Sequence, residues 1–200
     1  MSRSSFPHSS RATHTIRIIG GDWKRTSLPV PDLAGLRPTP DRVRETLFNW
    51  LGQRLDGLRC LDLFAGSGAL GFEAASRGAA RVVMVERHPR AVAQLRANQA
   101  RLDARALDIV KADALQFAAS LAPGSFDVVF LDPPFDGDLL GRALALAVPL
   151  IATQGFLYAE SGATLDLAAN AALTGWTLVR QGKAGAVHYH LLQRHCANST

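Results

Sequence analysis

The chain has 200 residues, of which 48% are hydrophobic and 20% are charged. This composition predicts one globular domain with a substantial core and argues against a disordered chain. No apolar run approaches the roughly 18 residues of a membrane-spanning helix, so we expect no membrane partner. Residues 1–15 lack a secretion signal and are predicted to be a flexible tail, with a short transit peptide as the less favoured alternative. Cys60 and Cys196 fit neither a disulfide framework nor a metal site, which favours a reducing, cytoplasmic location.

The formal net charge of +5 resides in the first part of the chain. Residues 1–59 hold ten Lys and Arg against five Asp and Glu, whereas residues 60–200 hold twelve of each. A basic leading segment ahead of a neutral body favours a polyanionic partner, most simply a nucleic acid. A solvated basic surface without a partner is the alternative.

Two short β-prone runs come first in the predicted structure. Residues 16–21 (IRIIGG) end in a Gly-Gly turn, and residues 26–30 form the second run. Together they predict a small ribbon, whose basic and aromatic side chains are Arg17, Trp23, Lys24 and Arg25. Such side chains can hold phosphates and stack on a base. The equally weighted alternative is that Trp23 only anchors the ribbon to the body.

Residues 36–55 predict a helix that is entered through Arg37-Pro38-Thr39. Thr39 is suited to cap a helix whose first residue is Pro40. Hydrophobic side chains at every fourth position predict a buried stripe of Val43, Leu47, Leu51 and Leu55. Arg42 and Arg44 fall on other faces, where arginines are usually solvated. Arg37, at the helix entrance, is the better candidate for contacting an anion or closing over a cofactor.

From residue 60 onward, strand-like and helix-like segments alternate. The predicted strands are 60–64, 81–86, 107–111, 126–131 and 155–160, and the predicted helices are 69–77, 89–102, 114–121 and 137–150. Nearly continuous apolar strands that alternate with helices indicate a doubly wound, Rossmann-like α/β fold with a parallel sheet covered on both faces. Residues 176–181 and 187–194 are β-prone and predict a closing hairpin.

A glycine-rich turn follows the first buried strand. Residues 60–71 read CLDLFAGSGALG, and the chain is expected to turn through Gly66, Gly68 and Gly71 before the next helix. Glycine permits tight turns and lets the backbone approach a ligand closely. A strand, a G-x-G-x-x-G turn and a helix together predict a nucleotide-cofactor crevice.

Acidic residues follow four of the predicted strands and indicate which cofactor binds. Asp62, Glu86, Asp113 and Asp132 would surround one crevice, where they would repel a pyrophosphate but suit the sulfonium and ammonium of S-adenosylmethionine. Glu86 is expected to accept from the ribose hydroxyls and Asp113 from the adenine amine. The predicted cofactor-binding residues are Asp62, Phe64, Gly66, Ser67, Gly68, Glu86, Arg87, Asp113, Ala114 and Asp132. Read singly, each acid could instead be a loop residue or a helix cap.

Asp132-Pro133-Pro134-Phe135, after the fourth of these strands, is the predicted catalytic segment. Prolines fix the backbone, so that a carbonyl and the Asp132 carboxylate can accept both hydrogens of an exocyclic amine. Phe135 offers a face on which the base can stack. Carbon methylation usually requires a cysteine nucleophile, and neither cysteine lies in this segment. The residues therefore predict amine methylation, with guanine N2, adenine N6 and cytosine N4 all open, and a Pro-Pro turn that merely ends the strand as the alternative.

These residues resemble the class I S-adenosylmethionine-dependent methyltransferases with a (D/N)-P-P-(F/Y/W) motif, and more closely the bacterial RsmD family of 16S rRNA guanine-N2 methyltransferases. The similar stretches are IRIIGGDWKRTSLPVPDLAGLRPTPDRVRETLFNWL, CLDLFAGSGALGFEAASRGA and DVVFLDPPF. The resemblance implies a seven-stranded sheet with a reversed final strand. It also implies methylation of guanine N2 in small-subunit ribosomal RNA, with the base flipped into the pocket.

On this basis the expected partner is small-subunit ribosomal RNA or the small ribosomal subunit, bound by a monomer without a metal. The predicted RNA-binding residues are Arg17, Trp23, Lys24, Arg25, Arg37 and Arg42. The expected organisation is a tail (1–15), a basic ribbon and helix packed on the body (16–58), a methyltransferase domain (59–195) and a second tail (196–200). Alternatives of other classes are a nicotinamide-dependent oxidoreductase and a non-enzymatic RNA-binding assembly factor.

Overall fold

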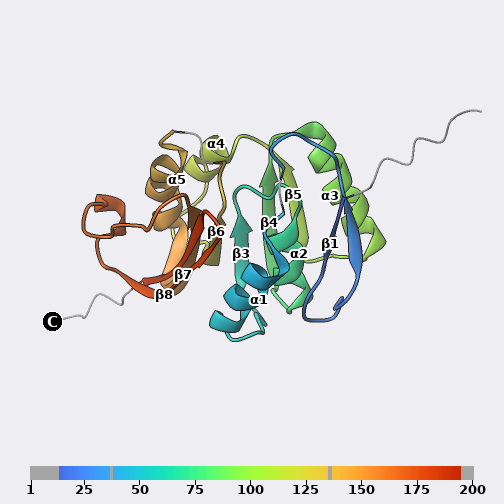
Figure 1. Ribbon diagram of the computed structural model, residues 1–200, viewed down its shortest axis with the longest axis horizontal. Coiled ribbons are helices and arrows are strands. Elements are labelled where there is room, and N and C mark those ends of the chain that lie inside the picture. The colour runs from blue at the N-terminus through green and yellow to red at the C-terminus, as the bar shows by residue number, and fades with distance from the viewer. Residues whose placement is uncertain (1–13, 37, 135–136, 195–200) are drawn as a thin grey trace, which may run out of the picture.

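The computed structural model describes residues 14–36, 38–134 and 137–194. Figure 1 shows a central sheet with helices on both of its faces. The strands are β1 (His14–Arg17), β2 (Ser27–Val30), β3 (Arg59–Asp62), β4 (Arg81–Glu86), β5 (Leu107–Lys111), β6 (Phe126–Leu131), β7 (Ile151–Ser161), β8 (Trp176–Ala184) and β9 (Val187–Arg194). The α-helices are α1 (Asp41–Trp50), α2 (Ala69–Ser76), α3 (Pro89–Arg101), α4 (Ala114–Ala119) and α5 (Leu139–Ala147), and the 3-10 helices are η1 (Val148–Leu150) and η2 (Ala171–Leu173).

The larger sheet has seven strands in the order β5-β4-β3-β6-β7-β9-β8. Strands β3 to β7 pair in parallel, whereas β9 is antiparallel to both β7 and β8. The expected seven-stranded sheet with a reversed final strand is therefore confirmed. Because the chain runs outward from β3 to β5 and then returns to β6, the strand order reverses between β3 and β6. Ligands of such sheets bind at the carboxyl ends of the strands beside this point.

Two hydrophobic cores lie on the two faces of the sheet, as alternation along the strands requires. Cys60, Val82 and Phe130 belong to the core that is shared with α1, α2 and the N-terminal strands. Leu61 and Leu131 belong to the core that is shared with α4 and α5. Both faces of the sheet are thus buried, which accounts for the nearly continuous apolar strands in the sequence.

The N-terminal ribbon packs on the body through alternating hydrophobic residues. Strands β1 and β2 are antiparallel, with Ile16 paired to Leu28, and both side chains are buried in the core with α1 and α2. Strand β1 is His14–Arg17, so the expectation of a strand over 16–21 is only partly right. Residues 18–25 instead form the turn between the strands, where the Asp22 N–H donates to the Ser76 carbonyl at the end of α2.

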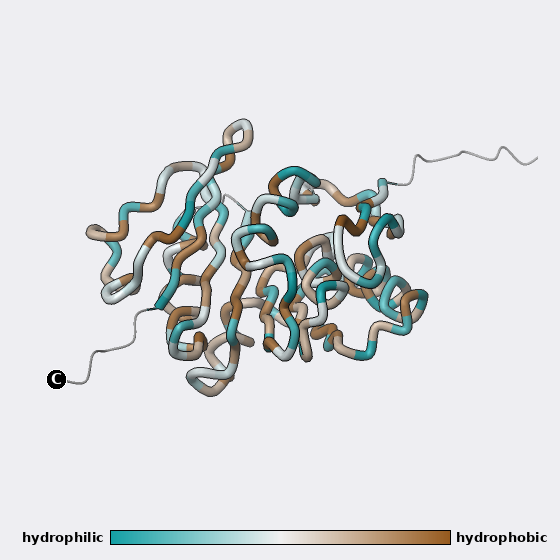
Figure 2. The backbone as a smooth tube through the Cα atoms, turned by 90° about the horizontal axis from the view of Figure 1, so that it is seen from below, coloured by the Kyte–Doolittle hydropathy of each residue, from teal (hydrophilic) through white to brown (hydrophobic). Residues whose placement is uncertain are grey.

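Helix α1 is shorter than the sequence pattern predicted. It spans Asp41–Trp50, its N-cap is Pro40, and the expected cap by the Thr39 side chain is wrong. Leu55 is buried as expected, although it lies beyond the end of the helix. In the hydropathy-coloured trace of Figure 2, hydrophobic and hydrophilic segments alternate along the chain. Within the part of the chain that the structure describes, no helix is long and apolar enough to cross a membrane.

Candidate active site at the carboxyl ends of β3, β6 and β7

The glycine-rich turn lies between β3 and α2 at the switch point of the sheet. Gly66 and Gly68 have φ values of +51° and +82°, which other L-residues rarely adopt. Gly71 differs from this expectation because it lies inside α2. A Cβ at Gly71 would be 2.7 Å from the Met84 side chain, so this glycine permits close packing of the helix on β4.

The Glu86 carboxylate, at the end of β4, binds the backbone of this turn. It accepts from the Gly66 N–H at 3.0 Å and from the His88 N–H at 2.7 Å. In dinucleotide sites, turn N–H groups of this kind face a pyrophosphate. Here the Gly66 N–H donates to a carboxylate, which does not favour a phosphate at the same position.

Three carboxyl side chains line up across neighbouring strands on one face of the sheet. Asp62 pairs with Phe130 across β3 and β6, and Leu131 pairs with Ala159 across β6 and β7. Asp132 directly follows β6, and at this register Glu160 of β7 lies beside it. Asp132 comes two residues after Phe130, the partner of Asp62, and Glu160 two residues after Tyr158, the partner of Phe130, so alternation directs all three acids to the same face. Asp62 is 2% exposed and Glu160 is 4% exposed.

The pKa values of these three carboxyls are all raised. Burial and the neighbouring Asp132 charge raise the pKa of Asp62 to about 7, while N–H groups of Gly71 and Phe64 oppose the shift. Burial raises the pKa of Asp132 to about 6. Burial and the Asp132 charge raise the pKa of Glu160 to about 8. Among the described residues, the ion pairs do not include any of these three acids, so the cluster would favour a cationic ligand.

Sequence reasoning missed Glu160. Its Oε1 atom accepts a 2.7 Å hydrogen bond from the hydroxyl of Tyr158, two residues earlier on the same face of β7. Tyr158 in turn packs edge-on against Phe130, with ring centroids 6.4 Å apart. An available signal was the position of Glu160 at the end of an apolar strand, like Asp62 and Asp132.

The segment before α1 reaches Asp132. The Thr39 hydroxyl donates to Asp132 Oδ2 at 3.4 Å, and the Thr39 carbonyl accepts from Arg44 Nε at 3.2 Å. Leu36 lies over the glycine turn, because a Cβ at Gly66 would be 3.0 Å from the Leu36 Cδ1 atom. Leu36 and Thr39 therefore both lie at the site.

Arg44 is fully buried, and the expectation that it is solvated is wrong. Its guanidinium contacts Glu73 of α2 at 3.2 Å and the Arg17 carbonyl at 2.9 Å. Glu73, also fully buried, pairs with Arg77 at 2.8 Å and accepts from the N–H groups of Ile19 and Gly20. This network fastens the N-terminal ribbon and α1 to the helix that follows the glycine turn. Part of the basic excess of the leading segment is thus neutralised inside the protein.

Other predicted cofactor residues lie beside the crevice in different roles. Asp113 is the N-cap of α4, and its Oδ1 atom accepts a hydrogen bond from the Gln116 N–H at 3.0 Å. The alternative that this acid is a helix cap is therefore correct for that oxygen. Ala114 begins α4 and is buried, whereas Arg87 is exposed directly after β4. The remaining members of the predicted set, Phe64 and Ser67, are part of the chain between β3 and α2.

The predicted RNA-binding residues separate into two places. Arg17 and Arg42 are exposed near the start of α1, where Arg17 pairs with Asp41 at 2.9 Å. Trp23, Lys24 and Arg25 lie in the turn between β1 and β2, next to the C-terminal end of α2. The Trp23 N–H donates to the Ser76 hydroxyl at 3.0 Å and its side chain packs against the core, which favours the anchoring alternative. Arg37 and Phe135 lie outside the described residues.

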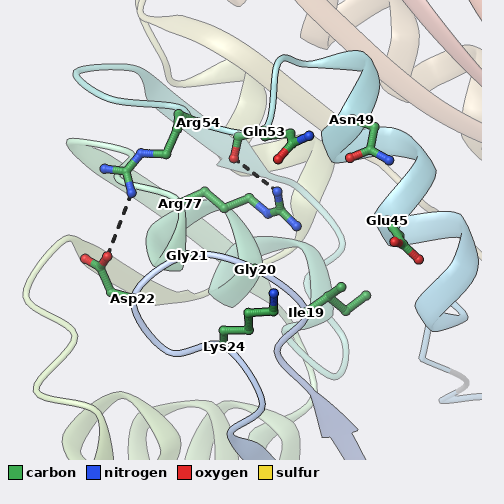
Figure 3. Close-up of a pocket in the computed structure, with 10 residues that line it drawn as sticks. All are labelled: Ile19, Gly20, Gly21, Asp22, Lys24, Glu45, Asn49, Gln53, Arg54 and Arg77. Carbon is green, nitrogen blue, oxygen red and sulfur yellow. Dashed lines mark hydrogen bonds and ion pairs between the residues drawn. The ribbon is translucent and has the colours of Figure 1, made fainter.

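A cavity of about 470 Å³ opens beside this turn, away from the carboxyl row. Figure 3 shows Arg77 between the Gly20-Gly21 backbone and Gln53, whose carbonyl accepts from Arg77 at 3.0 Å. Arg54 and Asp22 face each other across its rim at 3.8 Å. Within residues 14–36, 38–134 and 137–194, no cluster of three or more His, Cys, Asp or Glu could hold a metal ion.

The fold and the glycine turn define a Rossmann-like α/β protein with a row of carboxyls at the carboxyl ends of its strands. A family model described as "Conserved hypothetical protein 95" matches residues 16–193. The chain belongs to this family, and the resemblance to the RsmD family is confirmed.

Relatives of known name align over most of the chain. "Ribosomal RNA small subunit methyltransferase D" of Escherichia coli (strain K12) is 45% identical over 181 residues, which are 90% of each protein. The protein of the same name from Haemophilus influenzae is 39% identical over 183 residues, which are 89% of this chain and 93% of the relative. The structure of "Putative methyltransferase yhhF from Escherichia coli" superposes with a TM-score of 0.79 at 42% identity, covering 92% of this chain and 99% of the other.

Proposed function

We propose that this protein transfers a methyl group from S-adenosylmethionine to the N2 amine of a guanine in small-subunit ribosomal RNA. The names of the aligned relatives support the reaction class and the RNA. The observation that carries the proposal is the position of Asp132, which lies at the carboxyl end of β6 beside the glycine turn and is braced by Pro133 and Pro134.

The residues of the crevice fit S-adenosylmethionine. The positive φ at Gly66 and Gly68 keeps side chains out of the turn, which leaves room for a ligand. The Gly66 N–H already donates to Glu86, which suits a cofactor without phosphate better than a dinucleotide. The buried Asp62 and the partly buried Asp132 supply negative charge with no cationic side chain paired to them among the described residues, so a sulfonium and an ammonium would offset their mutual repulsion.

S-adenosylmethionine supplies an electrophilic methyl group when it is bound. Asp132 accepts a hydrogen of the target amine, and a carbonyl of the proline segment accepts the other, which orients the nitrogen lone pair. Because the pKa of Asp132 is about 6, this carboxyl is ionised at neutral pH and can act as an acceptor. The Thr39 hydroxyl donates to Asp132 Oδ2 and thereby holds the carboxylate in place. No strong general base is required, because the nitrogen becomes acidic only as it gains the methyl group.

Carbon methylation of a pyrimidine is disfavoured by the state of Cys60. Burial raises the pKa of its thiol to about 12, so the thiolate nucleophile that this chemistry requires is scarce at neutral pH. Cys60 is also fully buried in the core, two residues before Asp62 on β3, where the target base cannot reach it. Amine methylation needs no such nucleophile.

RNA contacts are proposed for the exposed arginines at the start of α1. Arg17 and Arg42 flank the segment that reaches Asp132, so they can bind phosphates next to the target base. Lys24 and Arg25 would contact RNA farther from the reacting base, since they lie at the opposite end of α2. Such a spread of cations suits a folded RNA better than a short single strand.

The test is transfer of labelled methyl groups to small ribosomal subunits that lack the modification, followed by nucleoside analysis of the labelled base. We expect N2-methylguanine, and Asp132→Ala should lower the rate by about 100-fold or more while adenosylmethionine binding largely survives, because Asp62 remains. Asp108→Ala, at an exposed aspartate on β5, is the control and should match the wild type. Labelled N6-methyladenine or N4-methylcytosine would contradict the proposed base. RNA binding without any methyl transfer would favour an assembly factor instead.

A further inference from the structure

Glu160 is a buried carboxyl that the proposed mechanism does not use. It stands next to Asp132 in the parallel register of β6 and β7, on the face of the sheet that forms the crevice. The Tyr158 hydroxyl donates to its Oε1 atom at 2.7 Å. This contact fixes the side chain and marks Oε1 as an acceptor, whether Glu160 is ionised or neutral.

The groups around Glu160 favour its neutral form. Asp132 faces it from β6, Tyr158 from β7 itself, and Tyr189 is its register partner on β9. Burial and the Asp132 charge raise the pKa of Glu160 to about 8, against the opposing hydrogen bond from Tyr158. Asp132, with a pKa of about 6, is ionised at neutral pH. Two adjacent carboxyls in different protonation states are a common arrangement where each has a separate task.

Guanine has a hydrogen-bond pattern that matches this pair. Next to its N2 amine comes the N1–H donor, followed by the O6 acceptor. A neutral carboxyl carries one acceptor oxygen and one O–H donor side by side, so it can accept from N1–H and donate to O6. In adenine and cytosine the ring nitrogen next to the amine is an acceptor, so the carboxyl could donate to it but would receive no second hydrogen bond from the base.

We propose that Glu160 is the specificity-determining residue that binds N1–H and O6 of the target guanine while Asp132 holds its N2 amine. This inference rests on the proposed function and names the group that selects the base. A buried site built to pair with a hydrogen-bond pattern rejects bases that leave its polar groups unpaired. Tyr158 is a positioning residue in this arrangement, because it holds Glu160 and does not touch the base.

Two substitutions at Glu160 test the assignment. Glu160→Met keeps the length of the side chain but cannot form hydrogen bonds, and should lower kcat/KM for the small-subunit substrate by about 10- to 100-fold at pH 7. Glu160→Gln keeps one acceptor and one donor, and should stay within a few-fold of the wild type at pH 7. The wild-type rate should decline as the pH rises through about 8, where Glu160 ionises, and the glutamine variant should lose this decline. Adenosylmethionine binding by calorimetry and thermal unfolding are recorded for both variants.

The outcomes separate this inference from the proposed function. If the wild type methylates guanine N2 and Glu160→Met has an unchanged kcat/KM, Glu160 does not read the base, although the function stands. If the wild type transfers no methyl group to guanine, the function itself fails. Should the methionine variant not fold, the glutamine variant decides alone: an alkaline decline equal to that of the wild type overturns the inference. A glutamine variant as impaired at pH 7 as the methionine variant overturns it too.

Discussion

The Thr39 hydroxyl donates to Asp132 Oδ2 at 3.4 Å, and so joins the segment before α1 to the residue proposed to hold the target amine. This contact continues into a buried network, because Arg44 binds the Thr39 carbonyl and pairs with Glu73 on α2. The N-terminal segment therefore contributes a side chain to the proposed active site.

Replacing Thr39 by valine should shift the acid side of the pH–rate profile. The hydrogen bond from Thr39 lowers the pKa of Asp132, whereas burial raises it to about 6. Without the hydroxyl the pKa rises further, so the rate should begin to fall at a higher pH, by at most about one pH unit. The measurement is kcat/KM between pH 5 and pH 8. Thr39→Ser keeps the hydroxyl and should retain the wild-type profile; an identical shift in both variants would contradict this role.

The carboxyl row should make the protein less stable as the pH rises. Asp62, Asp132 and Glu160 have folded-state pKa values of about 7, 6 and 8, each above the ordinary value. Their protonation therefore stabilises the folded state fully below about pH 4, and this contribution is lost as the pH rises through 6 to 8.

Glu160→Gln should remove one part of that loss. The Tm of the variant should equal that of the wild type near pH 5 and exceed it by a few degrees at pH 8.5, because glutamine does not ionise. Comparing the two proteins at each pH cancels the effect of the other titrating groups, including the buried His190, whose pKa is lowered by burial. A Tm difference that is constant with pH would show that Glu160 has no raised pKa.

Glu73 should be among the most sensitive positions for stability. Its carboxylate is fully buried between Arg44 and Arg77, so Glu73→Ala removes the buried anion that both arginines share. Arg44 would keep its pair with the more exposed Asp41, and Arg77 its hydrogen bond to the Gln53 carbonyl. We expect a loss of about 3–5 kcal/mol in the free energy of unfolding, measured by denaturant titration. The control is Asp108→Ala, which breaks the exposed pair with Arg81 and should cost less than about 1 kcal/mol. Equal losses in the two variants would rule out the structural role of the buried network.

Much of the fold followed from periodicity, whereas side-chain partners did not. The alternation of apolar strands and helices predicted the parallel sheet, and the positions of Asp62 and Asp132 after strands predicted their shared edge. Arg44 was misjudged because an arginine on a helix is usually solvated, and its partner Glu73 lies 29 residues away. Glu160 was missed because which strand lies beside β6 depends on the order of the strands, which the local pattern does not contain.

Gly71→Ala should reduce stability even though alanine favours helices. Alanine gains up to about 1 kcal/mol in helix propensity, but its Cβ would lie 2.7 Å from the buried Met84 side chain, and overpacking costs about 1–3 kcal/mol. Gly141→Ala in α5 is the matched control, because the three atoms nearest to its Cβ would belong to the side chain of the exposed Asp138, which can rotate away. Denaturant unfolding should show Gly71→Ala destabilised and Gly141→Ala neutral or stabilised. The reverse order would contradict the packing role assigned to Gly71.

Arg42 should contribute to RNA binding through its charge rather than through base recognition. Its side chain is exposed near the start of α1, on the segment that reaches Asp132. Neutralising one phosphate contact lowers affinity at all sequences and reduces the salt dependence of binding by about one unit in the log–log slope. Arg42→Ala should therefore raise KM for the small-subunit substrate, with little change in kcat, and the effect should shrink as salt is raised. Arg105→Ala, at an exposed arginine paired with Asp103 in the loop between α3 and β5, is the control and should bind like the wild type. If the two variants have the same KM and the same salt slope as the wild type, the start of α1 is not an RNA-binding surface.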